Sequence, residues 1–195
     1  MRYEPEHKQQ TRQKVLRAAT RAIRAEGPHR MSVAKVMAKA GLTVGGFYAH
    51  FESKDALIAA AIDEMFAEAR SRLALEAGDR PPAAALGAYI DFYLSPAHRD
   101  SRAAGCPMPA LAADLPRLTA KARERFAAGV AGLRGRLAGR LAELGFADAE
   151  TQASSMVAEL VGALSLARAE PDPLASDAIL ERSKAALKYR YSLEL

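Results

Sequence analysis

The chain has 195 residues, of which 50% are hydrophobic and 6% aromatic, and its net charge is +5 at pH 7. Its single cysteine excludes a disulfide framework within the chain and a multi-cysteine metal site. No run of 18 apolar residues is present and the polar start does not resemble a signal peptide, so we expect a soluble cytoplasmic protein without a membrane span.

The first helices are predicted from apolar residues that recur at helical spacing. They span residues 6–26, 33–40, 43–50, 53–75 and 82–94. Gly27-Pro28 ends the first, because Gly tolerates a left-handed conformation and Pro cannot continue a helix. Ser32, Thr43 and Ser53 are suited to cap the next three helices.

The second half of the chain is also predicted to be helical after an irregular stretch over residues 95–109, which contains three prolines. The predicted helices there span residues 110–114, 116–144, 149–169 and 176–191. Sustained alternation of β-branched residues is absent, so sheet is not predicted. The expected fold class is all-α.

The positive charge of the chain is concentrated near its start. Residues 1–55 hold 11 Lys or Arg against 5 Asp or Glu, whereas residues 56–195 hold 17 against 18. This asymmetry is typical of a polyanion-binding module joined to a nearly neutral body. A solvated basic face gives the same pattern, so charge alone leaves both interpretations open.

Residues 32–51 contain a short helix, a turn at Gly41 and a second short helix, which is the spacing of a helix-turn-helix. Val33, Val36 and Met37 are placed to bury the first of these helices. Phe47 and Phe51 are placed to hold the second against the body, leaving its N-terminal side chains to reach base edges.

Within this segment, residues 41–57 read GLTVGGFYAHFESKDAL and resemble the DNA-binding signature of the TetR family of repressors. Thr11-Arg12 and the stretch 31–33 resemble the first two helices of that family, so the resemblance covers about residues 10–60. It implies a nine-helix protomer with a three-helix DNA-binding domain over residues 1–52. Residues 53–195 would then form a domain that binds an effector and dimerises.

The resemblance also implies roles for individual residues in the basic segment. Tyr48 is expected to contact the DNA backbone, and Lys54 adds positive charge where a helix begins. The predicted DNA-binding residues are Ser32, Thr43, Val44, Gly45, Gly46, Tyr48, His50 and Lys54. Gly46 departs from the usual Thr, Ser or Ala, and Ala49 from a frequent His, so the operator sequence does not follow from the motif.

The helix over residues 149–169 carries small and apolar residues at helical spacing, which permits close approach of another helix. The predicted homodimer interface comprises Ala153, Val157, Leu160, Val161, Leu164 and Ser165. The alternative is that this stripe packs only within its own protomer. Family resemblance favours a four-helix bundle between two subunits.

A ligand cavity is expected in the middle of the chain. A subset of the following residues is predicted to line it, the alternative for each being the plain core: Met65, Phe66, Tyr89, Phe92, Tyr93, Cys106, Met108, Leu111, Phe126 and Met156. Few charges fall on the predicted inward faces, which favours a mainly apolar effector. Cys106 is either a thiol or electrophile sensor, helped by nearby Arg99 and Arg102, or a buried small hydrophobe.

The predicted function is that of a transcriptional regulator, by family default a repressor released from its operator by a small molecule. An enzyme is not predicted, because the four histidines lack metal-ligand spacing and a glycine-rich phosphate loop is missing. We expect no cofactor and no metal. A helical interaction protein whose basic head meets an acidic partner is the remaining alternative.

Overall fold

The computed structural model describes residues 3–193, and over that range it contains helices but no strands. The nine α-helices are α1 (Tyr3–Glu26), α2 (Val33–Lys39), α3 (Lys54–Ala77), α4 (Pro82–Tyr93), α5 (Pro96–Asp100), α6 (Pro107–Leu111), α7 (Ala120–Glu143), α8 (Ala149–Ala169) and α9 (Pro173–Arg190). Three short 3-10 helices are η1 (Val44–Ala49), η2 (Arg102–Ala104) and η3 (Leu115–Arg117). The all-α prediction is confirmed.

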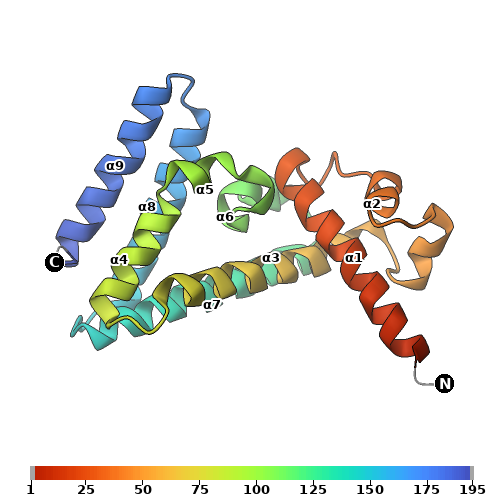
Figure 1. The fold of residues 1–195 in the computed structure, drawn as a ribbon, viewed down its shortest axis with the longest axis horizontal. Coiled ribbons are helices and arrows are strands. Elements are labelled where there is room, and N and C mark those ends of the chain that lie inside the picture. The colour runs from red at the N-terminus through yellow and green to blue at the C-terminus, as the bar shows by residue number, and fades with distance from the viewer. Residues whose placement is uncertain (1–2, 194–195) are drawn as a thin grey trace.

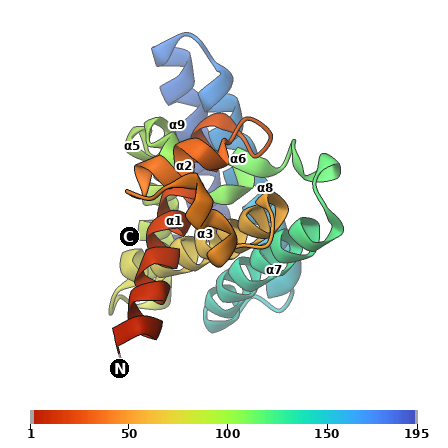
Figure 2. The ribbon, with the colours of Figure 1, turned by 90° about the vertical axis from the view of Figure 1, so that its right-hand side faces the viewer.

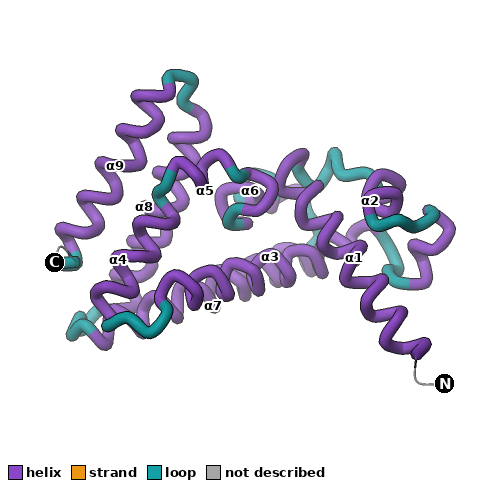
Figure 3. Tube along the Cα trace, in the orientation of Figure 1, coloured by secondary structure: helices purple, strands orange, loops and turns teal. Residues whose placement is uncertain are grey.

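The helices form an elongated molecule with a distinct head at one end (Figure 1). The head consists of α1, α2 and η1, and Figure 2 looks directly onto it. The paired helices α3 and α7 run from the head along the body, while α8 and α9 form the opposite end together with the C-terminus. Short loops join these elements, as the trace in Figure 3 shows.

Several helix starts follow from capping side chains. Ser32 Oγ accepts a hydrogen bond from the Lys35 amide, and Ser53 Oγ accepts one from the Ala56 amide, as predicted for α2 and α3. The start predicted at residue 116 is wrong, because Thr119 caps α7 by accepting from the Ala122 amide. Asp172 likewise caps α9, which begins at Pro173, three residues before the predicted start.

The segment predicted as irregular over residues 95–109 is partly helical. Ser95 caps α5 by accepting a hydrogen bond from the His98 amide at 3.1 Å, and Pro96 occupies the first turn. The short helix expected over residues 110–114 instead begins at Pro107 and ends at Leu111. Proline breaks a helix when it lies in the middle, but it is tolerated in the first turn. Pro96 and Pro107 therefore begin short helices here.

A continuous apolar core joins the head to the body. It includes a close approach of α3 and α7 at Gly129, where a Cβ atom would overlap the Phe66 ring. Only a residue without a side chain fits between these helices. Within residues 3–193, no helix is long and apolar enough to cross a membrane.

Candidate nucleic-acid interface and ligand cavity

The helix-turn-helix of the head is built around the turn after α2. Gly41 has a φ of +75°, a conformation that a Cβ atom would disfavour, and the Leu42 amide donates to the Met37 carbonyl at 3.0 Å. The second helix, η1, is a 3-10 helix, and Thr43 makes no side-chain capping bond, so the cap predicted there is wrong. Adjacent Gly45 and Gly46 explain the irregularity, because glycine weakens regular helix.

The aromatic residues of η1 separate an inner from an outer face. Phe47 and Phe51 are buried and stack with ring centroids 5.9 Å apart, which holds η1 against the head. Tyr48 is 76% exposed and Val44 is 50% exposed, and Thr43 and Gly45 are also exposed. The outer face therefore offers one phenol hydroxyl and several small side chains to a partner.

Two further predicted DNA-binding residues lie at helix starts beside this face. The half-buried Lys54 begins α3, and its ammonium group donates to the His29 carbonyl at 3.0 Å. Ser32 begins α2 and its hydroxyl is used in capping. Positive charge is thus fixed close to the backbone amides of the first turn of α3, where anions are favoured.

His50 and Gly46 occupy less open positions. His50 is half-buried and lines a small hollow with residues of α1, α3 and α7. Burial lowers the pKa of His50, and the nearby cations Lys8 and Arg12 lower it further. Gly46 is also half-buried and faces the Met37 side chain.

The body contains a cavity of about 1130 Å³ bounded by α1, α3, α4 and residues 95–106. Four of the predicted ligand-binding residues line it, namely Tyr89, Phe92, Tyr93 and Cys106. The other six do not: Met65, Phe66, Met108, Leu111, Phe126 and Met156. Five of these six are buried core residues, and Phe126 packs edge-on against Phe66 with centroids 5.3 Å apart, so for these six the alternative of plain core applies.

The expectation of few charges on the inward faces is wrong. Six basic residues line the cavity: Lys14, Arg17, Arg21, Arg24, Lys39 and Arg72. One carboxylate, Glu68, lies among them, and its Oε2 is 2.6 Å from the Arg24 guanidinium. The signal was present in the sequence, since Lys14, Arg17 and Arg21 recur at helical spacing on one face of α1.

Cys106 lies on the cavity wall inside a hydrogen-bonded turn. The His98 ring donates from Nδ1 to the Tyr93 carbonyl at 2.8 Å and accepts at Nε2 from the Cys106 amide at 3.1 Å. Burial raises the pKa of the Cys106 thiol and lowers the pKa of His98. Both groups are therefore held neutral by their surroundings.

The arginines near Cys106 in the sequence do not activate it. Arg99 instead pairs with Asp100 at 2.8 Å and with Asp177 of α9 at 2.6 Å. Arg102 is exposed on η2. Because a reactive cysteine needs an accessible thiolate, this environment favours the interpretation of Cys106 as a buried small hydrophobe.

The predicted dimer residues on α8 divide into two groups. Ala153, Val157, Leu160 and Leu164 are buried within the protomer, so they are wrong as surface contacts and belong to the core. Val161 and Ser165 are half-exposed, and the Ser165 hydroxyl donates to the Val161 carbonyl. The stripe that faces outward is displaced around the helix.

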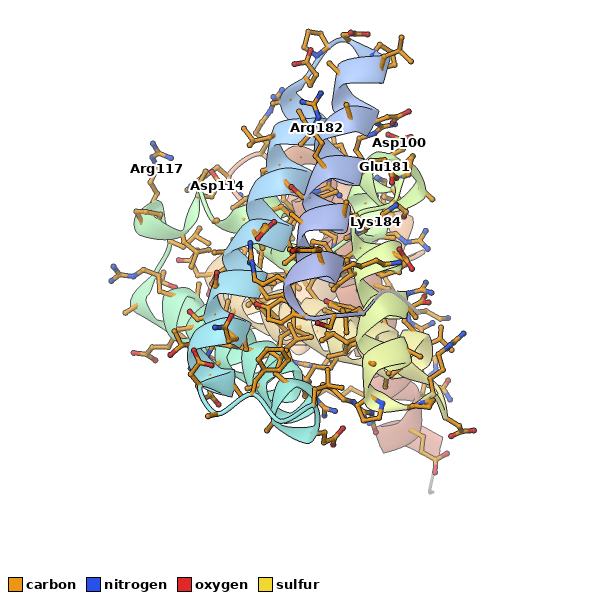
Figure 4. All side chains as sticks on the ribbon, turned by 90° about the vertical axis from the view of Figure 1, so that its left-hand side faces the viewer. Asp100, Asp114, Arg117, Glu181, Arg182 and Lys184 are labelled. Carbon is orange, nitrogen blue, oxygen red and sulfur yellow. The ribbon has the colours of Figure 1, made fainter. Side chains whose placement is uncertain are left out.

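The outer surface of α8 and α9 also presents large apolar groups. Leu166 is 64% exposed, and Leu174 and Tyr189 of α9 are more exposed still. Figure 4 looks onto this end of the molecule and marks charged residues of α9, among them Glu181 and Arg182. Large apolar side chains bordered by charges are typical of a protein–protein interface.

Comparisons with known proteins agree with this arrangement of head and body. Residues 15–61 match the family described as bacterial regulatory proteins, tetR family. Residues 82–180 match the family described as transcriptional regulator LmrA/YxaF-like, C-terminal domain. Among curated proteins, no sequence matches this chain.

Solved structures with the same fold cover nearly the whole chain. A TetR transcriptional regulator from Chloroflexus aurantiacus is 26% identical, with 96% of each chain covered and a TM-score of 0.81. E. coli NemR in its reduced form is 23% identical, with 92% of this chain and 96% of that chain covered and a TM-score of 0.81. A TetR family regulator from Agrobacterium tumefaciens is 24% identical, with 92% and 98% covered and a TM-score of 0.77.

Proposed function

Because this chain belongs to the TetR family of bacterial transcriptional regulators, we propose that it binds operator DNA as a homodimer and is released when a small molecule fills the cavity. Members of this family are DNA-binding transcription factors rather than enzymes. Residues 1–52 form the DNA-binding part in this proposal, and residues 53–195 bind the effector and dimerise. The operator lies in the bacterial cytoplasm, so the protein works there.

The observation that carries the DNA-binding proposal is the outward face of η1. Tyr48 and Val44 are exposed while their neighbours Phe47 and Phe51 are buried, so η1 is fixed to the head without using its outer side chains. Both exposed side chains suit contact with DNA, Tyr48 through its hydroxyl to a phosphate and Val44 through van der Waals contact with a base edge. The basic charge of the same segment fits a phosphate backbone.

Two-fold pairing gives this head its specificity. A single short recognition helix reads few base pairs, whereas two heads in a dimer address half-sites about one helical turn, ~34 Å, apart. The exposed apolar groups of α8 and α9 support pairing at the end of the body remote from the heads. The operator is then expected to be an inverted repeat.

Effector release follows from the position of α1. This helix belongs to the head, yet four of its basic residues line the cavity in the body. A ligand that fits the cavity better in one arrangement of α1 and α4 than in another shifts the population toward that arrangement. The spacing of the two heads then no longer matches the operator.

Selection of bound duplexes from a random pool, with the full chain, tests the proposal. The expected result is enrichment of an inverted repeat that the chain binds at least about a thousandfold more tightly than random duplex at physiological salt. Equal affinity for all duplexes at every salt concentration would contradict an operator-binding regulator. That outcome would instead support an interaction protein with a basic head.

A further inference from the structure

The cavity contains more positive charge than its own carboxylate neutralises. Arg24 and Arg72 are the two cations of its wall with ion pairs among the described residues, to Glu68 and Glu76. Lys14, Arg17 and Arg21 line it without one. An excess of cations around a concave space attracts anions from solution.

Arg24 is the buried member of this set, with 5% of its surface exposed. Its Nη2 donates to Glu68 Oε2 at 2.6 Å, but its buried Nε–H has no hydrogen-bond partner. In a guanidinium group, Nε and Nη2 form one edge that matches the two oxygens of a carboxylate. Half of this edge is therefore unused.

Tyr93 of α4 supplies a second group of this kind to the cavity lining. Its side chain is 1% exposed, and its hydroxyl has no oxygen or nitrogen partner. The group beside this hydroxyl is the weakly polar thiol of Cys106. Buried hydroxyl groups are nearly always hydrogen-bonded in folded proteins. Arg24 on α1 and Tyr93 on α4 both line the cavity, and each has a buried donor without an oxygen or nitrogen acceptor, which points to an acceptor that the protein itself does not supply.

Part of the remaining wall is aromatic. The rings of Tyr89 and Tyr93 lie 5.8 Å apart, Tyr89 and Phe92 lie 6.4 Å apart, and the Arg72 guanidinium sits 4.8 Å above the half-buried Phe92 ring. Such surfaces hold flat unsaturated rings by edge and face contacts. The cavity volume of about 1130 Å³ is sufficient for a drug-sized ligand.

We propose that the effector is an aromatic carboxylate whose anionic group binds Arg24 and the Tyr93 hydroxyl while its ring system packs on Phe92. This inference rests on the proposed function and names the chemical class of its effector. It replaces the mainly apolar effector that the sequence favours. The difference from that expectation is the negative charge that the ligand carries.

Binding of such a ligand in the cavity would also affect the head. The Arg24–Glu68 ion pair joins α1 of the head to α3 of the body. A ligand carboxylate competes with Glu68 for the same guanidinium edge, so its binding weakens this connection. Among the side chains that the structure describes, the other hydrogen bond between these helices runs from Gln13 to Glu64; it lies farther toward the start of α1 and leaves that end attached.

Titration calorimetry of the full chain with benzoate, cinnamate and 2-naphthoate, without DNA, tests the proposal. Acetate and the primary amide of each acid serve as matched ligands that lack the ring or the charge. We expect the larger aromatic acids to bind at least about tenfold more tightly than their amides and than acetate. Amides that bind as well as the acids, or a panel in which nothing binds, would overturn it.

Two variants locate the charge recognition. Arg24→Gln is expected to reduce the affinity for 2-naphthoate about tenfold without changing that for its amide. Arg72→Gln, at an exposed side chain whose loss leaves the core intact, is expected to reduce it about threefold. Arg136→Gln on α7, outside the cavity, is the control. Equal affinity in all three variants would contradict the assignment.

Operator binding, measured separately on the same samples, keeps the two proposals apart. If 2-naphthoate binds and the chain lacks operator preference, the cavity assignment stands and the regulator proposal fails. If operator DNA is bound selectively and the acids do not bind, the effector class is wrong and the regulator proposal stands. Release of operator DNA by 2-naphthoate but not by its amide supports both.

Discussion

Adjacent residues of η1 have opposite surroundings, and this contrast determines which of them can meet DNA. Phe47 is buried while Tyr48 projects into solvent, and their rings meet edge-on at 5.2 Å. The buried ring fixes the direction of the exposed one, so little entropy is lost when the phenol meets a phosphate. Lys54 is similarly held in place by its hydrogen bond to the His29 carbonyl.

Tyr48→Phe and Lys54→Ala are each expected to weaken binding to operator and random duplex alike. Lys54→Ala should also lower the slope of log affinity against log salt by about 0.9, because one phosphate contact is lost. Fluorescence anisotropy over a range of salt concentrations measures both quantities, and Arg136→Ala, at an exposed position of α7, is the matched control. A variant that keeps non-specific affinity but no longer discriminates between operators would contradict phosphate contact.

The burial of Cys106 gives a prediction about its reactivity. Because burial raises the pKa of this thiol, little thiolate is present at neutral pH. We expect an aromatic disulfide reagent to react at least about tenfold more slowly with the native chain than with the chain unfolded in urea. Equal rates, followed by loss of DNA binding, would favour the thiol-sensing alternative.

His98 gives a prediction about pH. Burial lowers its pKa from the ordinary value of 6.5, so between these two values the unfolded chain binds a proton that the folded chain excludes. The free energy of unfolding is therefore expected to fall as pH decreases from about 7 through the lowered pKa. Urea unfolding at pH 7.5 and 5.5 measures the loss.

His98→Gln should show a smaller loss of stability over the same pH range, since the buried imidazole is gone. Some dependence remains, because burial also lowers the pKa of His50. His29→Gln, at an exposed position, is the control and should retain the full dependence. A His98→Gln protein with an unchanged pH dependence would show that the proton is taken up elsewhere.

At the scale of helices, the contact of α3 with α7 depends on the missing side chain of Gly129. A Cβ atom there would overlap the ring of Phe66, which cannot move freely because it is packed in the core. Gly129→Ala is expected to lower the free energy of unfolding by about 1–3 kcal/mol, as overpacked cores do.

Gly135→Ala is the matched control on the same helix. Apart from the backbone of α7 itself, no atom lies within 4 Å of the point where a Cβ atom would stand. The substitution should therefore raise the free energy of unfolding by up to about 1 kcal/mol through helix propensity alone. Urea unfolding of both variants compares them. Equal effects of the two substitutions would mean that α3 and α7 do not meet as closely as described.

Helix positions were largely predictable from the sequence, because apolar spacing and capping residues are local signals. The predicted helix over residues 149–169 agrees with α8 at both ends. The errors occur where a nearby residue provides a stronger signal, as Thr119 does for α7. The start of α9 at Pro173 shows that a proline interpreted as a boundary also serves as the first residue of a helix.

The candidate sites were less predictable because they depend on how helices face each other. The DNA-binding segment is continuous in sequence, so its exposed and buried residues follow from one motif. The cavity combines α1, α3 and α4, and apolar character alone did not distinguish its wall from the core filled by Met65 and Met156. The predicted dimer contacts on α8 were wrong at Leu160 and Leu164 for the same reason, since both side chains face the core of their own protomer.

For the molecule as a whole, α1 connects recognition with sensing. It packs on α3, contributes to the cavity and belongs to the head, so a change in the cavity reaches η1 through α1 and then α2, which packs on both α1 and η1. The Arg24–Glu68 ion pair is the contact in this path that a ligand can disturb directly. Coupling between sites needs a structural element whose position both sites influence, and α1 fulfils that condition.

A DNA-binding dimer also needs an interface between its subunits, which we propose at the end of the body remote from the head. A substitution at Leu166 tests this interface. This residue is 64% exposed on α8, on the side turned away from the core. Leu166→Asp is expected to weaken dimerisation by at least about 2 kcal/mol, roughly 30-fold, because an unpaired carboxylate would be buried. Analytical ultracentrifugation measures the equilibrium, and operator affinity should fall in parallel because a monomer reads one half-site.

Leu75→Asp is the matched control, since Leu75 is a similarly exposed leucine near the end of α3. It should leave both the dimer and operator binding unchanged, while both variants keep the helical circular dichroism signal of the parent chain. If Leu166→Asp remained dimeric and Leu75→Asp became monomeric, the subunits would pair through the α3 end of the body. The heads would then be separated by a different distance, and the predicted half-site spacing would fail with them.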